Sequence, residues 1–90
     1  MSNDKPKDPD HGRPAVTVFV NTRKEEVAEK ELSFDQVVRL AFPQGPFTEN
    51  IVYTVTYDYE HGGGGSMAPG GESVKVKKEM VFSVGQSDKS

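Results

Sequence analysis

The chain has 90 residues, of which 33% are hydrophobic, and a formal net charge of -3. This length allows one domain with a small interior, which disfavours an enzyme with a deep substrate pocket. The absence of cysteine excludes disulfides, thiol nucleophiles and thiolate metal sites. Acidic and basic residues are interspersed, without a basic face studded with aromatic residues, so nucleic acid is disfavoured as a partner.

Hydropathy bears on where the protein is found. No apolar run approaches the roughly 18 to 20 residues needed to cross a bilayer, and no charged-then-apolar leader opens the chain. We therefore expect a cytoplasmic protein without a membrane partner.

The first 14 residues differ in composition from the rest of the chain. Residues 1–14 contain three prolines and alternating charges, with no apolar residue after Met1. Such a segment cannot contribute to a core, so we expect a disordered N-terminal arm. The predicted domain then covers residues 15–84.

Two strands are predicted at the start of this domain. Residues 15–21 are rich in β-branched residues that alternate with others, and a more polar strand follows through about Lys30. Charged side chains on the second strand suit an exposed edge. The alternation places Val16, Val18 and Val20 on the inner face and Thr17 and Phe19 on the outer face.

A short helix should begin after Ser33. Ser33 and Gln36 have the spacing of a capping box, and Pro43 disfavours helical geometry at the residue before it. The apolar residues between them fall on one stripe at three- and four-residue spacings: Phe34, Val37, Val38 and Ala41. A helix this short requires packing on a sheet.

The second half of the chain alternates strands and glycine-rich segments. Residues 51–59 form the strongest predicted strand, and residues 60–71 are predicted to be a flexible glycine-rich loop. Two shorter strands follow at 73–77 and 80–84, and residues 85–90 are expected to be a flexible C-terminal tail. The element order indicates an α+β fold of the β-grasp type, with a mixed sheet of four to five strands packed on one helix.

Motifs for chemistry are weak. Gly62 to Gly65 lack the helix and lysine that follow in a phosphate-binding loop. His61 and Glu60 have too few neighbouring ligands for a metal site. We therefore expect no catalytic, cofactor-binding or metal-binding residues. A small metal or nucleotide binder remains a third reading, and it depends on these residues alone.

One surface feature is predicted from the alternation of the strands. If the inner valines are buried, Phe19 lies on the open face of the sheet, with Val81 beside it and Thr17 on the same face. An exposed apolar patch on a small domain suits a partner protein. Coverage by the arm, the loop or a second copy is the alternative.

Four segments together resemble the multiubiquitin-type domain of bacterial ubiquitin-like proteins. They read VTVFVNTRKEEV, ELSFDQVVRLAFP, VYTVTYDYEHGGG and MAPGGESVKVKKEMVFSV, and the resemblance spans about Val16 to Val84. It implies a ubiquitin-like β-grasp fold and a monomeric protein modifier that is not itself an enzyme. The implied partners are ubiquitin-activating-like and conjugating-like enzymes, a deubiquitinase-like protease and target proteins, encoded together in bacterial operons.

The C-terminal tail is the expected site of conjugation. Such a modifier reacts through its C-terminal carboxylate, and this chain has only Gly85 where ubiquitin has Gly-Gly. The predicted conjugation tail consists of Gly85, Gln86, Ser87, Asp88, Lys89 and Ser90. The alternative is a non-covalent adaptor that binds its partner through the apolar patch or a sheet edge.

Overall fold

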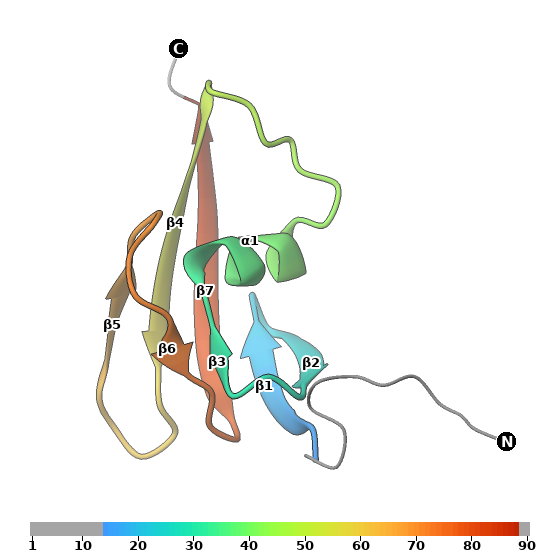
Figure 1. The fold of residues 1–90 in the computed structure, drawn as a ribbon, viewed down its shortest axis with the longest axis vertical. Helices are drawn as coiled ribbons and strands as arrows, with labels where there is room; N and C mark the ends of the chain where they lie inside the picture. The colour runs from blue at the N-terminus through green and yellow to red at the C-terminus, as the bar shows by residue number, and fades with distance from the viewer. Residues whose placement is uncertain (1–13, 89–90) are drawn as a thin grey trace, which may run out of the picture.

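A computed structural model describes residues 14–88, which form seven strands and one helix (Figure 1). The strands are β1 (Val16–Val20), β2 (Arg23–Val27), β3 (Glu31–Leu32), β4 (Ile51–Asp58), β5 (Gly64–Met67), β6 (Val74–Lys75) and β7 (Met80–Asp88), and the helix is α1 (Phe34–Ala41). The predicted N-terminal arm, residues 1–14, lies outside the described residues except for Pro14, which is exposed.

The main sheet has five strands in the order β2-β1-β7-β4-β5. β7 lies in the middle, parallel to β1 and antiparallel to β4, and the other neighbours are antiparallel. β3 and β6 form a second, two-stranded sheet. A mixed sheet with a parallel central pair and one helix on its face confirms the predicted ubiquitin-like β-grasp fold.

The helix begins where the sequence predicts. The Gln36 amide donates to the Ser33 hydroxyl at 3.2 Å, and the Ser33 amide donates to the Gln36 side chain at 2.8 Å. This capping box satisfies two amides that a helix start leaves without partners. At eight residues, α1 depends on packing, and it buries Val37 and Val38 against the sheet. No helix in the described part of the chain is long and apolar enough to cross a membrane.

The core lies between α1 and the inner face of the sheet. The predicted alternation is confirmed in β7, where Met80, Phe82 and Val84 are buried and the residues between them are exposed. β1 follows the same pattern with Val18 and Val20. The buried apolar residues are Val18, Val20, Val27, Leu32, Val37, Val38, Val55, Met80, Phe82 and Val84.

The glycine-rich segment 60–71 needs a correction, because Gly64–Met67 forms strand β5 rather than part of a loop. The Tyr59 amide donates to the Gly63 carbonyl at 3.0 Å, and β5 then pairs with the second half of β4. A side chain at Gly64 would collide with the Tyr57 carbonyl oxygen. Glycine at this position therefore allows the backbones of β4 and β5 to approach closely, although the glycine-rich composition of residues 60–71 favours a flexible segment.

The predicted tail also needs a correction, because Gly85–Asp88 continues β7 instead of leaving the sheet. These four residues pair with residues 51–54 at the start of β4. β4 has eight residues, and the longer β7 pairs with it along its full length. Lys89 and Ser90 lie outside the described residues.

We predict that the two faces of the sheet differ in their contribution to stability. Phe82→Ala should lower the free energy of unfolding by about 3 to 5 kcal/mol, because the side chain is fully buried and leaves a cavity. Phe19→Ala should cost only about 1 kcal/mol, because the ring is partly exposed on the outer face. Urea unfolding measures both values. A larger loss for Phe19→Ala would show that the inner face is wrongly assigned.

We also predict that the end of β7 stabilises the start of β4. Ending the chain at Gly85 should cost about 1 to 2 kcal/mol, because the Val52 and Ser87 backbones lose their pairing. Hydrogen exchange of the Val52 amide should become faster. Gln86→Ala is the control, since it leaves the backbone ladder in place and should preserve this protection. Unchanged exchange in the truncated chain would contradict the pairing.

Candidate functional site

Phe19 and Val81 lie side by side on the open face of the sheet, on the side away from α1. They are register partners in the parallel β1–β7 pair, and Val81 is 39% exposed. Their other neighbours in the same row are Lys24 on β2 and Asp58 on β4. The structure thus places an apolar pair between a cation and an anion, which is the arrangement of a small protein-binding patch with a polar border.

Thr17 lies on the same face, one row along β1 from Phe19. Its hydroxyl donates to the Glu26 carboxylate at 3.0 Å. The hydroxyl hydrogen is therefore used within the domain, and Thr17 offers a partner its methyl group and an acceptor lone pair. The three residues that the sequence assigns to the docking surface do share one face.

Val52 belongs to this open face and is absent from the predicted surface. It is 40% exposed and pairs with Ser87 near the far end of the β4–β7 ladder. Thr54 and Thr56 lie on the same face between Val52 and the level of Val81. The alternation of β4 predicts that Val52 points to the open face. Val52 lies at the opposite end of β4 from Asp58, which is level with Phe19 and Val81, so it forms a separate apolar spot.

The described part of the predicted conjugation tail, Gly85–Asp88, is part of a strand. These four residues are exposed and belong to β7. The Gln86 side-chain amide donates to the Tyr53 hydroxyl at 3.0 Å, and that hydroxyl donates to the Pro46 carbonyl at 2.6 Å. The structure therefore attaches the start of the tail to β4 and to the loop after the helix.

An aromatic cluster reinforces this end of the sheet. The Tyr53 ring lies 5.3 Å from Phe42 and 6.0 Å from Phe47, measured between centroids. The Arg39 guanidinium lies 4.3 Å from the Phe47 centroid. Periodicity within single elements does not reveal this cluster, since its members come from the helix, the loop and β4.

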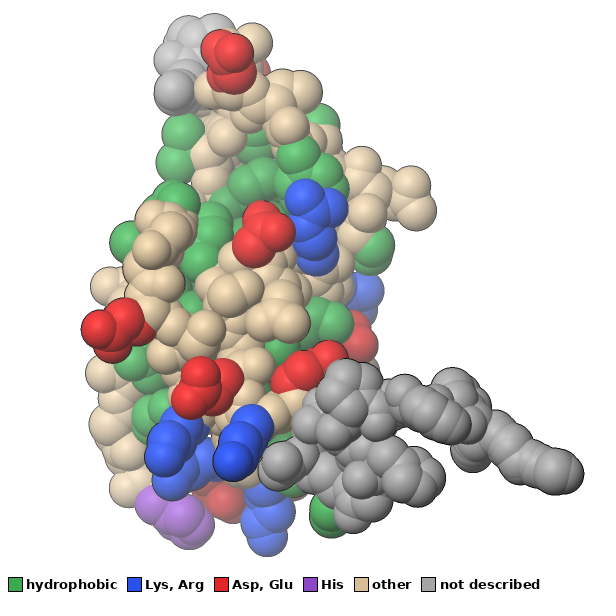
Figure 2. Space-filling view, in the orientation of Figure 1, with side chains coloured by type: hydrophobic (Ala, Val, Ile, Leu, Met, Phe, Trp, Pro, Cys, Tyr) green, Lys and Arg blue, Asp and Glu red, His purple; other side chains and the backbone are tan. Residues whose placement is uncertain are grey.

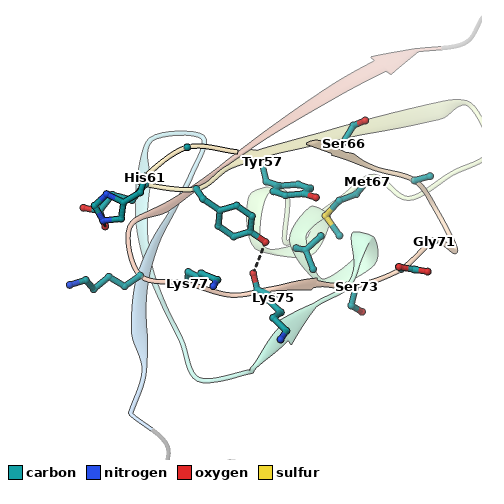
Figure 3. A pocket seen from close by; sticks show the side chains of 15 residues that line it. Tyr57, His61, Ser66, Met67, Gly71, Ser73, Lys75 and Lys77 are labelled. Carbon is teal, nitrogen blue, oxygen red and sulfur yellow. Dashed lines mark hydrogen bonds and ion pairs between the residues drawn. The ribbon is translucent and has the colours of Figure 1, made fainter. Parts of the chain in front are cut away.

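A groove of about 950 Å³ lies between the β4–β5 hairpin and residues 71–78 (Figure 3). Tyr57, Tyr59, Met67 and Val74 are its main apolar residues, and Lys75, Lys77 and Lys78 are its basic ones. In the view of the helix side, Lys and Arg side chains gather near the histidine at the lower left (Figure 2). Sequence reasoning missed this groove, because it forms only where the β4–β5 hairpin lies beside residues 71–78, and the sequence predicts a flexible loop for the β5 side of the hairpin.

Tyr59 connects the two walls of the groove. Its hydroxyl donates to the Lys75 carbonyl at 3.2 Å, and its ring meets the Tyr57 ring edge-on at 5.6 Å. Burial, and to a lesser degree the neighbouring Tyr57, raises the pKa of Tyr59 above its ordinary value. Tyr59 therefore stays neutral at physiological pH and serves as a hydrogen-bond donor, not as a base.

His61 and Glu60 lie at the mouth of this groove. The His61 Nε2 atom is 3.4 Å from the Glu60 carboxylate, and both side chains are exposed. Within residues 14–88, no group of three or more potential metal ligands comes together. What the described residues offer chemically is recognition: an apolar pair on the open face, a strand end and a groove.

Comparison with known proteins identifies the domain. The model of the Multiubiquitin family matches residues 16–88, which is most of the chain and all its main elements. No curated protein and no solved structure matches. The matched range begins at β1 and ends with β7, so it coincides with the β-grasp fold. The chain therefore belongs to the Multiubiquitin family.

Proposed function

We propose that this chain is a ubiquitin-like protein modifier, attached to target proteins through the run from Gly85 to Ser90. Activating-like and conjugating-like enzymes carry out the attachment, and a deubiquitinase-like protease reverses it. Membership of the Multiubiquitin family carries this proposal, over a domain whose last strand runs past the helix and ends at one end of the molecule (Figure 1).

The end of β7 can leave the sheet at low cost. Gly85–Asp88 buries no side chain, so its release exposes little apolar surface. The backbone groups that it frees exchange their partners for water, at about 1 kcal/mol per hydrogen bond. Once released, the six residues from Gly85 to Ser90 reach about 20 Å at roughly 3.3 Å per residue. A released segment of that length can enter a narrow active-site cleft, whereas a strand that is still paired with β4 cannot.

The apolar pair on the open face gives the enzymes a place to bind. Phe19 and Val81 lie on β1 and β7, which are interior strands of the sheet with a strand partner on each side. A rigid apolar contact costs little entropy on binding. Lys24 and Asp58 at its border supply charges of both signs, which favours a partner with a complementary pair.

The alternative function is a non-covalent adaptor of the same fold. One observation favours it: Gly85–Asp88 is paired with β4 and is not a free tail. A domain that is recognised without being attached has no need to release this strand. The two functions therefore differ in whether the strand end must open.

An engineered disulfide tests the opening of the strand end. Val52 and Ser87 are direct register partners, and such pairs lie about 5.5 Å apart between Cα atoms, within disulfide range. The double substitution Val52→Cys with Ser87→Cys should abolish attachment when oxidised and restore it when reduced. Attachment is measured by gel shift and intact mass, after adding N-terminally tagged protein and ATP to a lysate of the source cells.

The control for this experiment locks the same ladder elsewhere. Thr56→Cys with Ser83→Cys joins an equivalent pair, two such pairs further toward the middle of β4 and β7, and leaves the strand end free. Its oxidised form should be attached as the unmodified chain is. Normal attachment of the oxidised Val52–Ser87 variant would show that release is unnecessary. No attachment of any form, including the unmodified chain, would favour the adaptor.

The docking surface gives a separate prediction. Phe19→Ala with Val81→Ser should reduce attachment about 10-fold at limiting enzyme, because the apolar contact is lost while the strand end stays competent. A higher enzyme concentration should restore most of the signal. Val52→Ser is the matched control, since it removes an equally exposed valine from the same face, and it should change attachment less than about 2-fold. Equal effects of the two changes would contradict a localised docking surface.

A further inference from the structure

β5 is an edge strand with an unprotected outer side. It pairs only with β4 among the described strands. The Tyr59 amide donates to the Gly63 carbonyl at the turn between β4 and β5. Because backbone groups alternate in direction along a strand, the amides and carbonyls of the odd-numbered residues of β4 point toward β5. Gly65 and Met67 oppose those groups, and the amides and carbonyls of Gly64 and Ser66 therefore point away from the sheet.

β2, at the opposite edge of the sheet, is protected from pairing with other strands, whereas β5 is not. β2 has the sequence RKEEV, so four of its five residues are charged. Charged side chains on an edge strand prevent other strands from pairing with it. β5 has the sequence GGSM, without a charge or a proline, and three of its four residues are exposed. Its short length is its single protective feature, and short strands still accept a peptide when side-chain contacts help.

Such contacts are available directly beside β5. The groove next to it contains Ser66 and Met67 in its lining and continues to Val74 on the opposite wall. In Figure 3, the Tyr57 and Met67 side chains lie between the two walls. A strand added to β5 would project every second side chain toward this apolar floor. Gly65 contributes no side chain there, which keeps the groove open beside the edge.

The charges of the groove indicate the chemistry of the occupant. Its lining contains three lysines, Lys75, Lys77 and Lys78, and two glutamates, Glu60 and Glu72. Basic residues thus outnumber acidic ones in the groove, whereas the whole chain has a net charge of -3. No carboxylate of the described residues lies within ion-pair distance of the three ammonium groups. The groove is thus locally basic on an acidic protein, and it complements an acidic ligand.

We propose that β5 binds an extended peptide segment of a partner protein, which adds to the sheet as a further strand. The segment has apolar β-branched residues at alternate positions, which enter the groove over Tyr57 and Met67. Acidic residues flank them and meet the lysines. Backbone hydrogen bonds to Gly64 and Ser66 provide affinity, and the groove provides selectivity. The proposal does not depend on covalent attachment of the chain.

A second copy of the chain is a poorer occupant of this edge. Antiparallel pairing of two β5 strands would bring two lysine-lined grooves together. Like charges placed opposite each other across an interface cost several kcal/mol. A partner of opposite charge avoids this cost, so we assign the edge to an acidic segment.

A random dodecapeptide library displayed on phage and selected against the full chain provides the test. Selected sequences should contain alternating β-branched residues with Asp or Glu beside them. One such peptide is then synthesised and titrated into isotope-labelled protein. The amide shifts should change at residues 64–67 and 73–78, and not along β2.

Two protein variants and their controls measure the contributions of backbone and charge. Ser66→Pro removes an outward amide and should weaken binding about 10-fold or more, whereas Ser66→Ala keeps the amide and should stay within about 2-fold. Lys78→Glu should weaken binding about 3-fold or more. Lys24→Glu makes the same change of charge on the opposite edge, and it should have less than about a 2-fold effect.

A modified peptide keeps the test decisive if the proline variant does not fold. N-methylation of alternate amides on one edge of the synthetic peptide removes its donors without altering the protein, and it should also weaken binding about 10-fold or more. The proposal is overturned if the library yields no peptide whose binding depends on these amides, or if the shifts map to another face. Self-association of the chain that Ser66→Pro abolishes would overturn it in favour of a second copy.

Discussion

The position of β7 between β1 and β4 is the constraint on which the other features depend. A central strand must satisfy backbone groups on both sides, and β7 does so with a parallel and an antiparallel neighbour. Where β1 ends, the Asn21 side chain takes over: its amide donates to the Val84 carbonyl at 3.0 Å, and the Val84 amide donates to its carbonyl oxygen at 2.8 Å. A single side chain thus lengthens a five-residue strand and keeps the core part of β7 paired on both sides.

This position fixes the two faces of the sheet at once. With Met80, Phe82 and Val84 turned to the helix, the residues between them must point outward. The parallel register then brings Val81 to Phe19. The docking surface and the core are consequently two sides of one alternation, and a shift of β7 by one residue would exchange them. Only two of the outward residues on these strands are large and apolar, which keeps the patch small.

Along its length, β7 changes from a core strand to a weakly held one. Residues 80–84 alternate between buried and exposed, whereas all residues from Gly85 to Asp88 are exposed. The first part is anchored on both sides, and the second has β4 as its strand partner. Segments with few buried contacts open most easily, so the end of β7 is expected to open without the rest of the domain. The same strand can then stabilise the fold and supply a reactive end.

The sequence predicts those elements whose signal is local. The capping box at Ser33 and the alternation in β1, β4 and residues 80–84 specify their structure within a few residues, and the structure agrees. Alternation and the strand order also place Phe19 and Val81 on one face of neighbouring strands, and the parallel register of the structure makes them direct partners.

The elements that sequence reasoning missed are formed by tertiary pairing. GGSM and GQSD have low intrinsic strand propensity, and each becomes a strand because β4 presents backbone groups to it. A local reading of glycine favours a loop in both cases. At Gly64 the glycine permits the close approach of two backbones, and at Gly85 a side chain would come within 2.9 Å of the Thr54 hydroxyl oxygen. The same residue type that suggests a flexible segment is what allows these strands to form.

The candidate surfaces lie on different strands, which bears on how partners could share the domain. β4 separates β7 from β5, so the Phe19 and Val81 pair is at least about 10 Å from the outer edge of β5 at roughly 4.8 Å per strand. The groove beside β5 opens on the helix side, and the apolar pair lies on the opposite face. A peptide at the edge and a protein on the open face would therefore not compete for the same side chains. Because β4 contacts both β5 and the end of β7, a strand added to the edge would stiffen β4 without covering the end of β7. Both modes of recognition are thus compatible with one folded domain.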